Sequence, residues 1–191
     1  MTTLPYKPKT TFKKAVFFDR DGTLNDIVTR EDGTKGAPWN MKDFKIKPEA
    51  LKACELLRYQ GYGIFVVSNQ PDLGKGLAWQ TLRDMNSMLK NYLKVNDILA
   101  APERGSSYYK PNNGMIEDLI EKYEVDRKCS WMVGDSEKDI IAGSKSELKT
   151  IFIGSLYKKE LDFSIEPTYI KPDVWEAADE IVHRDFKGPK K

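Results

Sequence analysis

Histidine, cysteine and long apolar runs are scarce in this sequence. His183 is the one histidine, and we interpret it as a surface or core side chain rather than a ligand. Cys54 and Cys129 lie far apart in apolar segments, so we expect two buried free thiols and a cytoplasmic location. No apolar run approaches the roughly 18 residues of a membrane span, and the run after Lys14 is too short for a signal peptide. We therefore expect no membrane segment.

An excess of charge of either sign is also missing. The chain has 31 basic and 29 acidic residues and a formal net charge of +2, which gives no electrostatic reason to expect nucleic acid as a partner. Basic residues gather only at the two ends. Because 191 residues suffice for one domain with a core, we predict a single domain over residues 14–184, with basic tails at 1–13 and 185–191.

Apolar segments alternate with helical patterns along this domain. We expect strands at residues 15–18, 62–69, 97–101, 129–135 and 149–154. Helices are expected at residues 48–60, 78–93, 114–123, 136–144 and 172–182. Residues 22–47 indicate a long loop, and the segment before the last helix indicates irregular structure. The alternation predicts an α/β fold of the three-layer, Rossmann-like type, with a central parallel sheet of about five strands.

Polar residues follow the expected strands at the points where ligands bind in such sheets, beyond the carboxyl ends. These residues are Asp19 and Asp21 after the first strand, Ser68 and Asn69 at the second, Lys110 after the third, and Asp135 and Asp139 after the fourth. Their order along the chain favours one shared site.

Each of these groups also has a simpler interpretation when taken alone. The first two acids could be solvated turn residues or part of a calcium loop, although Leu24 and Arg30 stand where the EF-hand pattern needs Gly and Glu. The polar pair at the second strand is typical of a helix cap or a turn. A lone lysine is usually a surface residue, and the last two acids are typical of a helix N-terminus.

Taken together, these side chains suit phosphate chemistry. Clustered carboxylates repel one another unless a cation lies among them, and Mg²⁺ usually takes one or two carboxylates, here Asp19 and Asp135. Ser68 and Lys110 could then hold a phosphate dianion. A carboxylate such as Asp19 can also attack phosphorus and form an aspartyl-phosphate.

The one-residue gap between the first two acids fits a division of labour. Residues i and i+2 of an extended strand point the same way, so Asp19 and Asp21 can face one substrate while Arg20 turns aside. Asp21 could protonate the leaving alcohol and later deprotonate water. Gly22 would let the backbone turn sharply close to the phosphate.

Four segments resemble the motifs of the haloacid dehalogenase superfamily of phosphohydrolases. They are "DRDGTLN", "VVSNQ", "YKPNNGM" and "MVGDSEKDIIAG", and the resemblance spans about residues 14 to 154. Within the superfamily they are similar to the branch of histidinol-phosphate phosphatase and D-glycero-D-manno-heptose 1,7-bisphosphate phosphatase. That branch lacks a large cap domain, and no segment between the motifs is long enough for one.

The resemblance implies a role for each matching residue. It implies that Asp19 is the nucleophile, that Asp21 is the general acid and base, and that Asp139 supports the site from behind. The implied Mg²⁺ ligands are Asp19, Asp135 and the backbone carbonyl of Asp21. The implied phosphate- and substrate-binding residues are Ser68, Asn69, Gln70, Tyr109 and Lys110.

The sequence departs from this branch in two places. Many members hold a structural zinc in a Cys/His loop before the motif lysine, but "APERGSSYYKPNNGM" has neither residue, so we expect no structural zinc. The heptose enzymes tend to have an arginine before that lysine, whereas Tyr109 cannot make a bidentate guanidinium contact. Loop 26–44 and the turn at 71–76 would line the mouth of the site. Candidate substrate contacts there are Arg30, Lys35, Trp39, Lys75 and Arg104.

We therefore expect a Mg²⁺-dependent phosphomonoester hydrolase of carbohydrate metabolism, acting on a small sugar phosphate such as D-glycero-D-manno-heptose 1,7-bisphosphate. Histidinol-phosphate hydrolysis is an alternative, with Glu31 and Asp32 as partners for a cationic substrate. A nucleic-acid 3′-phosphatase and a non-catalytic binding protein are further alternatives. The sequence predicts no oligomeric state.

Overall fold

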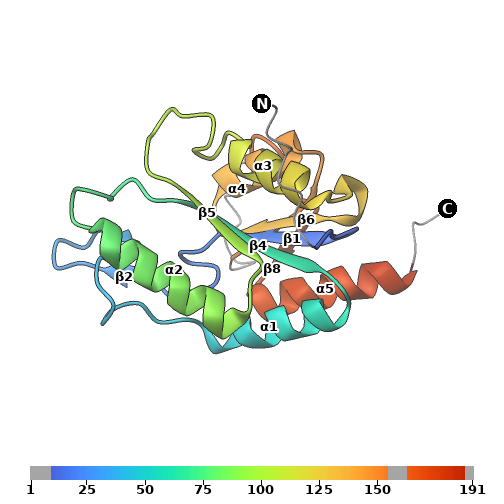
Figure 1. The fold of residues 1–191 in the computed structure, drawn as a ribbon, viewed down its shortest axis with the longest axis horizontal. Helices are drawn as coiled ribbons and strands as arrows, with labels where there is room; N and C mark the ends of the chain where they lie inside the picture. The colour runs from blue at the N-terminus through green and yellow to red at the C-terminus, as the bar shows by residue number, and fades with distance from the viewer. Residues whose placement is uncertain (1–9, 155–162, 188–191) are drawn as a thin grey trace, which may run out of the picture.

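A six-stranded parallel sheet forms the centre of the molecule (Figure 1). The computed structural model describes residues 10–154 and 163–187. In spatial order the strands are β5 (Asp97–Ala101), β4 (Gly63–Asn69), β1 (Ala15–Phe18), β6 (Trp131–Gly134), β7 (Lys149–Ile153) and β8 (Tyr169–Lys171). All neighbouring pairs are parallel, which confirms the predicted Rossmann-like α/β fold.

Helices cover both faces of the sheet (Figure 1). One face carries α1 (Pro48–Tyr59), α2 (Trp79–Leu93) and α5 (Val174–Lys187), and the other carries α3 (Gly114–Tyr123) and α4 (Glu137–Lys145). Strand β1 is buried on both faces because Val16 and Phe18 pack into the first helical layer, whereas Ala15 and Phe17 pack into the second. This explains why its four residues are apolar without alternation.

The strand order reverses at β1, which places a crevice at its carboxyl end. From β1 the chain crosses to β4 and β5 on one side, and later returns to β6, β7 and β8 on the other. Strands β4 and β6 therefore flank β1, with Phe18 opposite Val66 and Val133. Such a switch point is where open α/β sheets bind their ligands.

Two sequence-based expectations for the sheet need correction. The sheet has six strands rather than about five, because the three half-buried residues of β8 pair with the edge of β7. A strand that short carries no periodic signal. The segment 22–47 is not only loop, since β2 (Val28–Thr29) and β3 (Lys35–Gly36) form an antiparallel pair around a turn at Gly33.

The chain ends and the cysteines also differ in part from expectation. Residues 1–9 and 188–191 of the predicted tails lie outside the described residues. Phe12 packs against Phe65 at 5.8 Å between ring centroids, and α5 continues past residue 184 to Lys187. Cys54 is a buried free thiol as predicted, but the same prediction for Cys129 is wrong because it lies exposed in a short 3₁₀ turn before β6.

His183 is exposed on α5, which agrees with its interpretation as a surface side chain. None of the helices in the described ranges combines the length and the apolarity needed to cross a bilayer. The cytoplasmic location stays a prediction.

Candidate active site

Asp19 lies at the centre of the crevice, directly after β1. Its backbone N–H donates to the carbonyl of Val133 in β6 at 2.9 Å, so the sheet ladder fixes the residue's position. The residue is 8% exposed. The β1 strand therefore delivers one carboxylate to the point where the sheet reverses its order.

Lys110 reaches the same point from a loop, and Asn69 at the end of β4 holds it there. The Asn69 amide donates to the Lys110 carbonyl and accepts from its backbone N–H, both at 2.9 Å. The buried Lys110 amine contacts Asp19 and Asp139 at 2.6 Å each and the carbonyl of Val67 at 2.7 Å. All three ammonium donors are thus used.

Three acids crowd around that single amine. Carboxylate oxygens of Asp19, Asp135 and Asp139 all lie within 4.8 Å of one another. Burial raises the pKa of Asp19 to about 8; Lys110 opposes this rise, whereas Asp139 and Asp135 add to it. Burial and the neighbouring Asp139 raise the pKa of Asp135 to about 6. Burial opposes the charge on Lys110, but Asp139 and Asp19 hold its pKa above the usual range. The cluster therefore lacks positive charge.

The geometry of this cluster fits a hard cation such as Mg²⁺. Asp139 already bonds Lys110 through one oxygen, and its other oxygen accepts from the Ser136 N–H at 3.1 Å in a capping box at the start of α4. Asp19 and Asp135 are therefore the carboxylates better placed for a metal. Gly22, at φ +94°, leaves room for Asp135, because a Cβ there would stand 2.0 Å from its Oδ2.

Asp21 is held by four hydrogen bonds. Its Oδ1 accepts from Arg20 Nη2 at 3.1 Å and from Asn25 at 3.0 Å. Its Oδ2 accepts from Arg20 Nε at 3.1 Å and from Gln70 at 2.6 Å. Arg20 does not line the cavity with Asp19 and Asp21, which agrees with the expectation that it turns aside; its side chain is instead fully buried and binds the neighbouring acid.

The predicted residues share one open cavity of about 350 Å³. Those that line it are Asp19, Asp21, Asn69, Tyr109, Lys110, Asp135 and Asp139. Ser68 and Gln70 do not line it; they are buried behind it, where the Gln70 amide donates to Ser68 Oγ at 2.8 Å. The predicted site is thus brought together, with these two residues in a supporting layer.

Three exposed cations stand on the wall and rim of this cavity. Lys35 comes from β3, Arg104 from the loop after β5, and Lys138 from the first turn of α4. Their side chains have no hydrogen bond or ion pair with any other described residue. They are therefore available to an anionic ligand.

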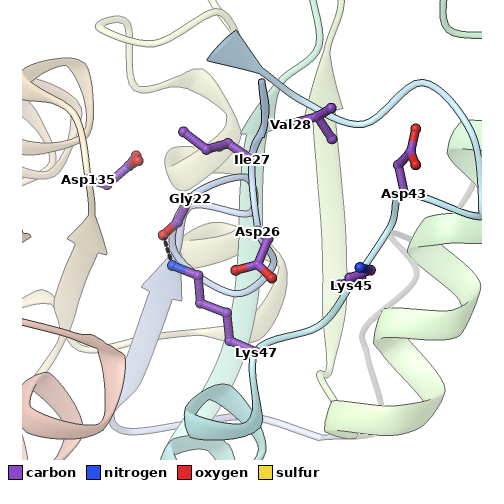
Figure 2. A pocket seen from close by; sticks show the side chains of 8 residues that line it. All are labelled: Gly22, Asp26, Ile27, Val28, Asp43, Lys45, Lys47 and Asp135. Atoms are coloured by element: carbon purple, nitrogen blue, oxygen red, sulfur yellow. Dashed lines mark hydrogen bonds between the residues drawn. The ribbon is translucent and has the colours of Figure 1, made fainter. Parts of the chain in front are cut away.

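A second cavity, of about 470 Å³, adjoins the first (Figure 2). Asp135 and Ile27 line both cavities. Figure 2 shows the Lys47 amine bonded to the carbonyl of Gly22. Lys47 also opposes the raised pKa of Asp135, although burial and Asp139 dominate. It thus contributes positive charge to the rear of the acid cluster.

The loops at the mouth of the site are tied to each other. The Arg30 guanidinium lies 4.0 Å from the centroid of the Trp39 ring, and the indole N–H donates to Asp72 at 2.9 Å. Arg30 and Trp39, two of the candidate substrate contacts, do not line the catalytic cavity, and neither does Lys75. Lys35 and Arg104 do.

Sequence reasoning missed several residues that shape the site: Arg20, Asn25, Lys47, Asn86 and Lys138. Arg20 carried a signal, because a charged residue between two site acids after a buried strand needs a partner of its own. Asn86 carried none, since it meets Arg20 only through the packing of α2.

Known proteins resemble this chain in sequence. A family model described as HAD-hydrolase-like matches residues 107–177. The chain is 31% identical to D-glycero-beta-D-manno-heptose-1,7-bisphosphate 7-phosphatase of Haemophilus ducreyi, over 72% of this chain and 81% of the relative. It is 27% identical to D-glycero-D-manno-heptose-1,7-bisphosphate 7-phosphatase of Chlorobaculum tepidum, over 86% of this chain and 92% of the relative.

Solved structures share the fold. The D,D-heptose 1,7-bisphosphate phosphatase of B. bronchiseptica, complexed with magnesium and phosphate, superposes with a TM-score of 0.73 at 22% identity, covering 90% of this chain and 99% of that one. A putative HAD-like phosphatase from Mesorhizobium loti gives a TM-score of 0.72 at 21% identity, covering 100% and 93%. With the sheet order, the motifs and the relatives in agreement, the chain belongs to the haloacid dehalogenase superfamily of phosphatases.

Proposed function

We propose that this phosphatase is a Mg²⁺-dependent phosphomonoester hydrolase that acts on a small sugar phosphate, D-glycero-D-manno-heptose 1,7-bisphosphate, through an aspartyl-phosphate on Asp19. The observation that carries the proposal is the group formed by buried Asp19 and Lys110 and half-buried Asp135 at the floor of a cavity. The substrate comes from the names of the relatives, which span most of this chain.

In the first half-reaction, a carboxylate oxygen of Asp19 attacks phosphorus and the ester oxygen leaves with its electron pair. Asp21, which lines the same cavity as Asp19, donates a proton to that oxygen, so that an alcohol departs. Lys110, through the donor that contacts Asp19 in the absence of substrate, and the backbone amides after β1 hold the phosphoryl oxygens in line. Mg²⁺, when held by Asp19, Asp135 and the Asp21 carbonyl, supplies charge neutralisation at those oxygens.

In the second half-reaction, water attacks the phosphorus of the aspartyl-phosphate. Asp21, now ionised, takes the proton of that water, and the Asp19 carboxylate is released together with inorganic phosphate. Lys110 stays bonded to Asp139, which keeps the amine in place while its contact with Asp19 changes. Asn69 fixes the Lys110 backbone through both half-reactions.

The rim cations support a substrate with a second anionic group. Lys35, Arg104 and Lys138 surround the cavity without partners among the described residues, and a distal phosphate would give them one. These cations supply positive charge in place of the arginine that the heptose enzymes tend to have at the position of Tyr109. Glu31 and Asp32, proposed partners of a cationic substrate, line a separate cavity of about 640 Å³ at the outer side of the hairpin, so histidinol phosphate gains no support.

A panel of phosphate monoesters with and without Mg²⁺ tests the proposal. We expect the heptose bisphosphate to turn over with the highest kcat/KM, above histidinol phosphate, p-nitrophenyl phosphate and a 3′-phosphorylated DNA duplex. Asp19→Asn should lower kcat at least about 10³-fold on every substrate, because it removes the nucleophile. Asp84→Asn, an exposed acid of α2, is the matched control.

Two results would count against the proposal. Equal rates for wild type and Asp19→Asn across the panel would remove phosphoryl transfer to Asp19. A higher kcat/KM for histidinol phosphate or the duplex than for the heptose bisphosphate would leave the phosphatase chemistry standing but reject the sugar-phosphate substrate.

A further inference from the structure

We propose that Arg20, anchored by Asn86 of α2, is a positioning residue that fixes the carboxylate of Asp21 for proton transfer. The inference rests on the proposed function, in which Asp21 is the general acid and base. It assigns a task to the one residue of the Asp19–Asp21 segment that does not face the substrate.

The burial of Arg20 is the first observation. Its side chain is 0% exposed, and it is among the largest fully buried side chains of the described chain. A buried guanidinium is costly unless its charge is paired and its donors are used. Here the closest Arg20–Asp21 approach is 2.9 Å, and the guanidinium also lies 5.7 Å from the centroid of the Phe44 ring.

The geometry of the contact is the second observation. Arg20 donates from Nε to one oxygen of Asp21 and from Nη2 to the other, both at 3.1 Å. A planar fork that meets both oxygens sets the plane of a carboxylate, which a single donor cannot do. Asn25 and Gln70 each contact only one oxygen. Among the described residues, Arg20 alone contacts both oxygens of the acid.

The anchor on α2 is the third observation. Arg20 Nη1 donates to Asn86 Oδ1 at 2.9 Å, 66 residues along the chain. The α2 residues next to this anchor, such as Met85 and Leu89, are fully buried in the core beneath the sheet. Because Asn86 sits on a helix packed in this way, it holds the outer end of the guanidinium at a fixed place.

This positioning has a kinetic signature that a general loss of structure lacks. An alkoxide leaving group needs a proton from Asp21, whereas p-nitrophenolate leaves readily without one. Misplacing Asp21 should therefore slow phosphoryl transfer to Asp19, the step that kcat/KM reports, far more for alkyl phosphates than for aryl phosphates. A structural fault would slow both alike.

The experiment measures kcat/KM of Arg20→Met and Asn86→Ala on two substrates. One is p-nitrophenyl phosphate; the other is the heptose bisphosphate or another alkyl phosphate that the wild type hydrolyses. For Arg20→Met we expect kcat/KM to fall about 100-fold on the alkyl ester and less than about fivefold on the aryl ester. Asn86→Ala should show the same pattern with a loss of about five- to tenfold on the alkyl ester. Asn91→Ala, an exposed residue of the same helix, should change neither.

A double-mutant cycle completes the test. In an Asp21→Asn background, Arg20→Met should cause no further loss on the alkyl ester, because its effect passes through Asp21. Equal losses on both esters, or additive losses in the cycle, would overturn the proposal. If Arg20→Met does not fold, Asn86→Ala becomes the test variant. In that case, equal kcat/KM values for Asn86→Ala and Asn91→Ala on both esters would overturn the proposal. Inactive wild type on all esters would instead refute the proposed function.

Discussion

Most charged groups at the floor of the cavity are paired, Asp135 excepted, whereas the cations on its rim have no partner among the described residues. At the floor, Lys110 is 3% exposed and bonds two carboxylates at 2.6 Å, and Asp21 accepts four hydrogen bonds. On the rim, Lys35 and Arg104 are exposed and have no partner among the described residues. The floor is held by contacts within the protein, whereas the rim cations leave their charges available to a ligand.

The difference follows from the elements that carry the two sets. The floor residues stand at the ends of β1, β4 and β6 or are clamped to them, so the sheet fixes their positions. The rim residues stand on the hairpin, on the loop after β5 and on the exposed side of α4. Loops on a rigid scaffold are where related proteins vary in what they bind. Substitutions at the floor should therefore affect chemistry and stability, and substitutions on the rim should affect substrate choice.

The largest effect is expected at the floor, from Lys110→Met. It removes the amine that pairs Asp19 with Asp139, so kcat should fall about 10²- to 10³-fold. Losing one partner of a buried pair should also lower the free energy of unfolding by about 3–5 kcal/mol in Mg²⁺-free buffer. Steady-state kinetics and urea unfolding measure the two effects.

Lys122→Met is the matched control, because Lys122 makes an ion pair of similar length, 2.8 Å to Asp97, at the surface. That variant should retain its kcat and unfold close to the wild-type urea midpoint. Equal destabilisation by the two variants would mean that burial does not distinguish floor from surface here.

The proximity of the floor residues could be predicted from the sequence because the pattern that indicates it is local. Asp19, Asp135 and Asp139 each follow a recognisable strand, and the carboxyl ends of parallel strands converge on one edge. Prediction from the sequence failed where a contact joins elements without a periodic signal: Arg20 with Asn86, or β8 with β7. These pairings depend on how helices and edges pack, which no single segment encodes.

The rim was predictable only as a set of loops. Trp39 was a candidate substrate contact, but its ring stacks with Arg30 and its indole N–H bonds Asp72. Lys138 was not predicted as a site residue, because Asp135 and Asp139 already explained the motif in which it stands. Which loop side chains face a cavity depends on how the loop that contains β2 and β3 packs against the turn at 71–76. That packing is a tertiary contact, which no local sequence pattern shows.

A smaller floor effect is expected for Mg²⁺ binding. Because burial and Asp139 raise the pKa of Asp135 in the metal-free cluster, a cation should relieve the repulsion and stabilise the fold. Mg²⁺ at 100 times its Kd should add about 2.7 kcal/mol to the free energy of unfolding. Asp135→Asn should lose most of that gain, as measured by Tm against Mg²⁺ concentration.

Asp43→Asn controls for a general effect of removing an acid nearby, because Asp43 lines the adjoining cavity but stands outside the acid cluster. It should keep the wild-type Mg²⁺ dependence. A wild-type Tm shift in Asp135→Asn would place the cation elsewhere than between Asp19 and Asp135.

The smallest effect is expected on the rim, from Arg104→Ala. An exposed cation meeting a distal phosphate contributes little, so KM for the heptose bisphosphate should rise about two- to fivefold at low salt. The kcat should be unchanged, because the floor is intact, and KM for p-nitrophenyl phosphate, which has no second anion, should also be unchanged. The difference should vanish at high ionic strength.

Lys75→Ala is the control, because Lys75 is an exposed lysine of the nearby turn that does not line the cavity. If Arg104→Ala instead lowered kcat on both substrates, the rim would share in the chemistry and the division between floor and rim would fail.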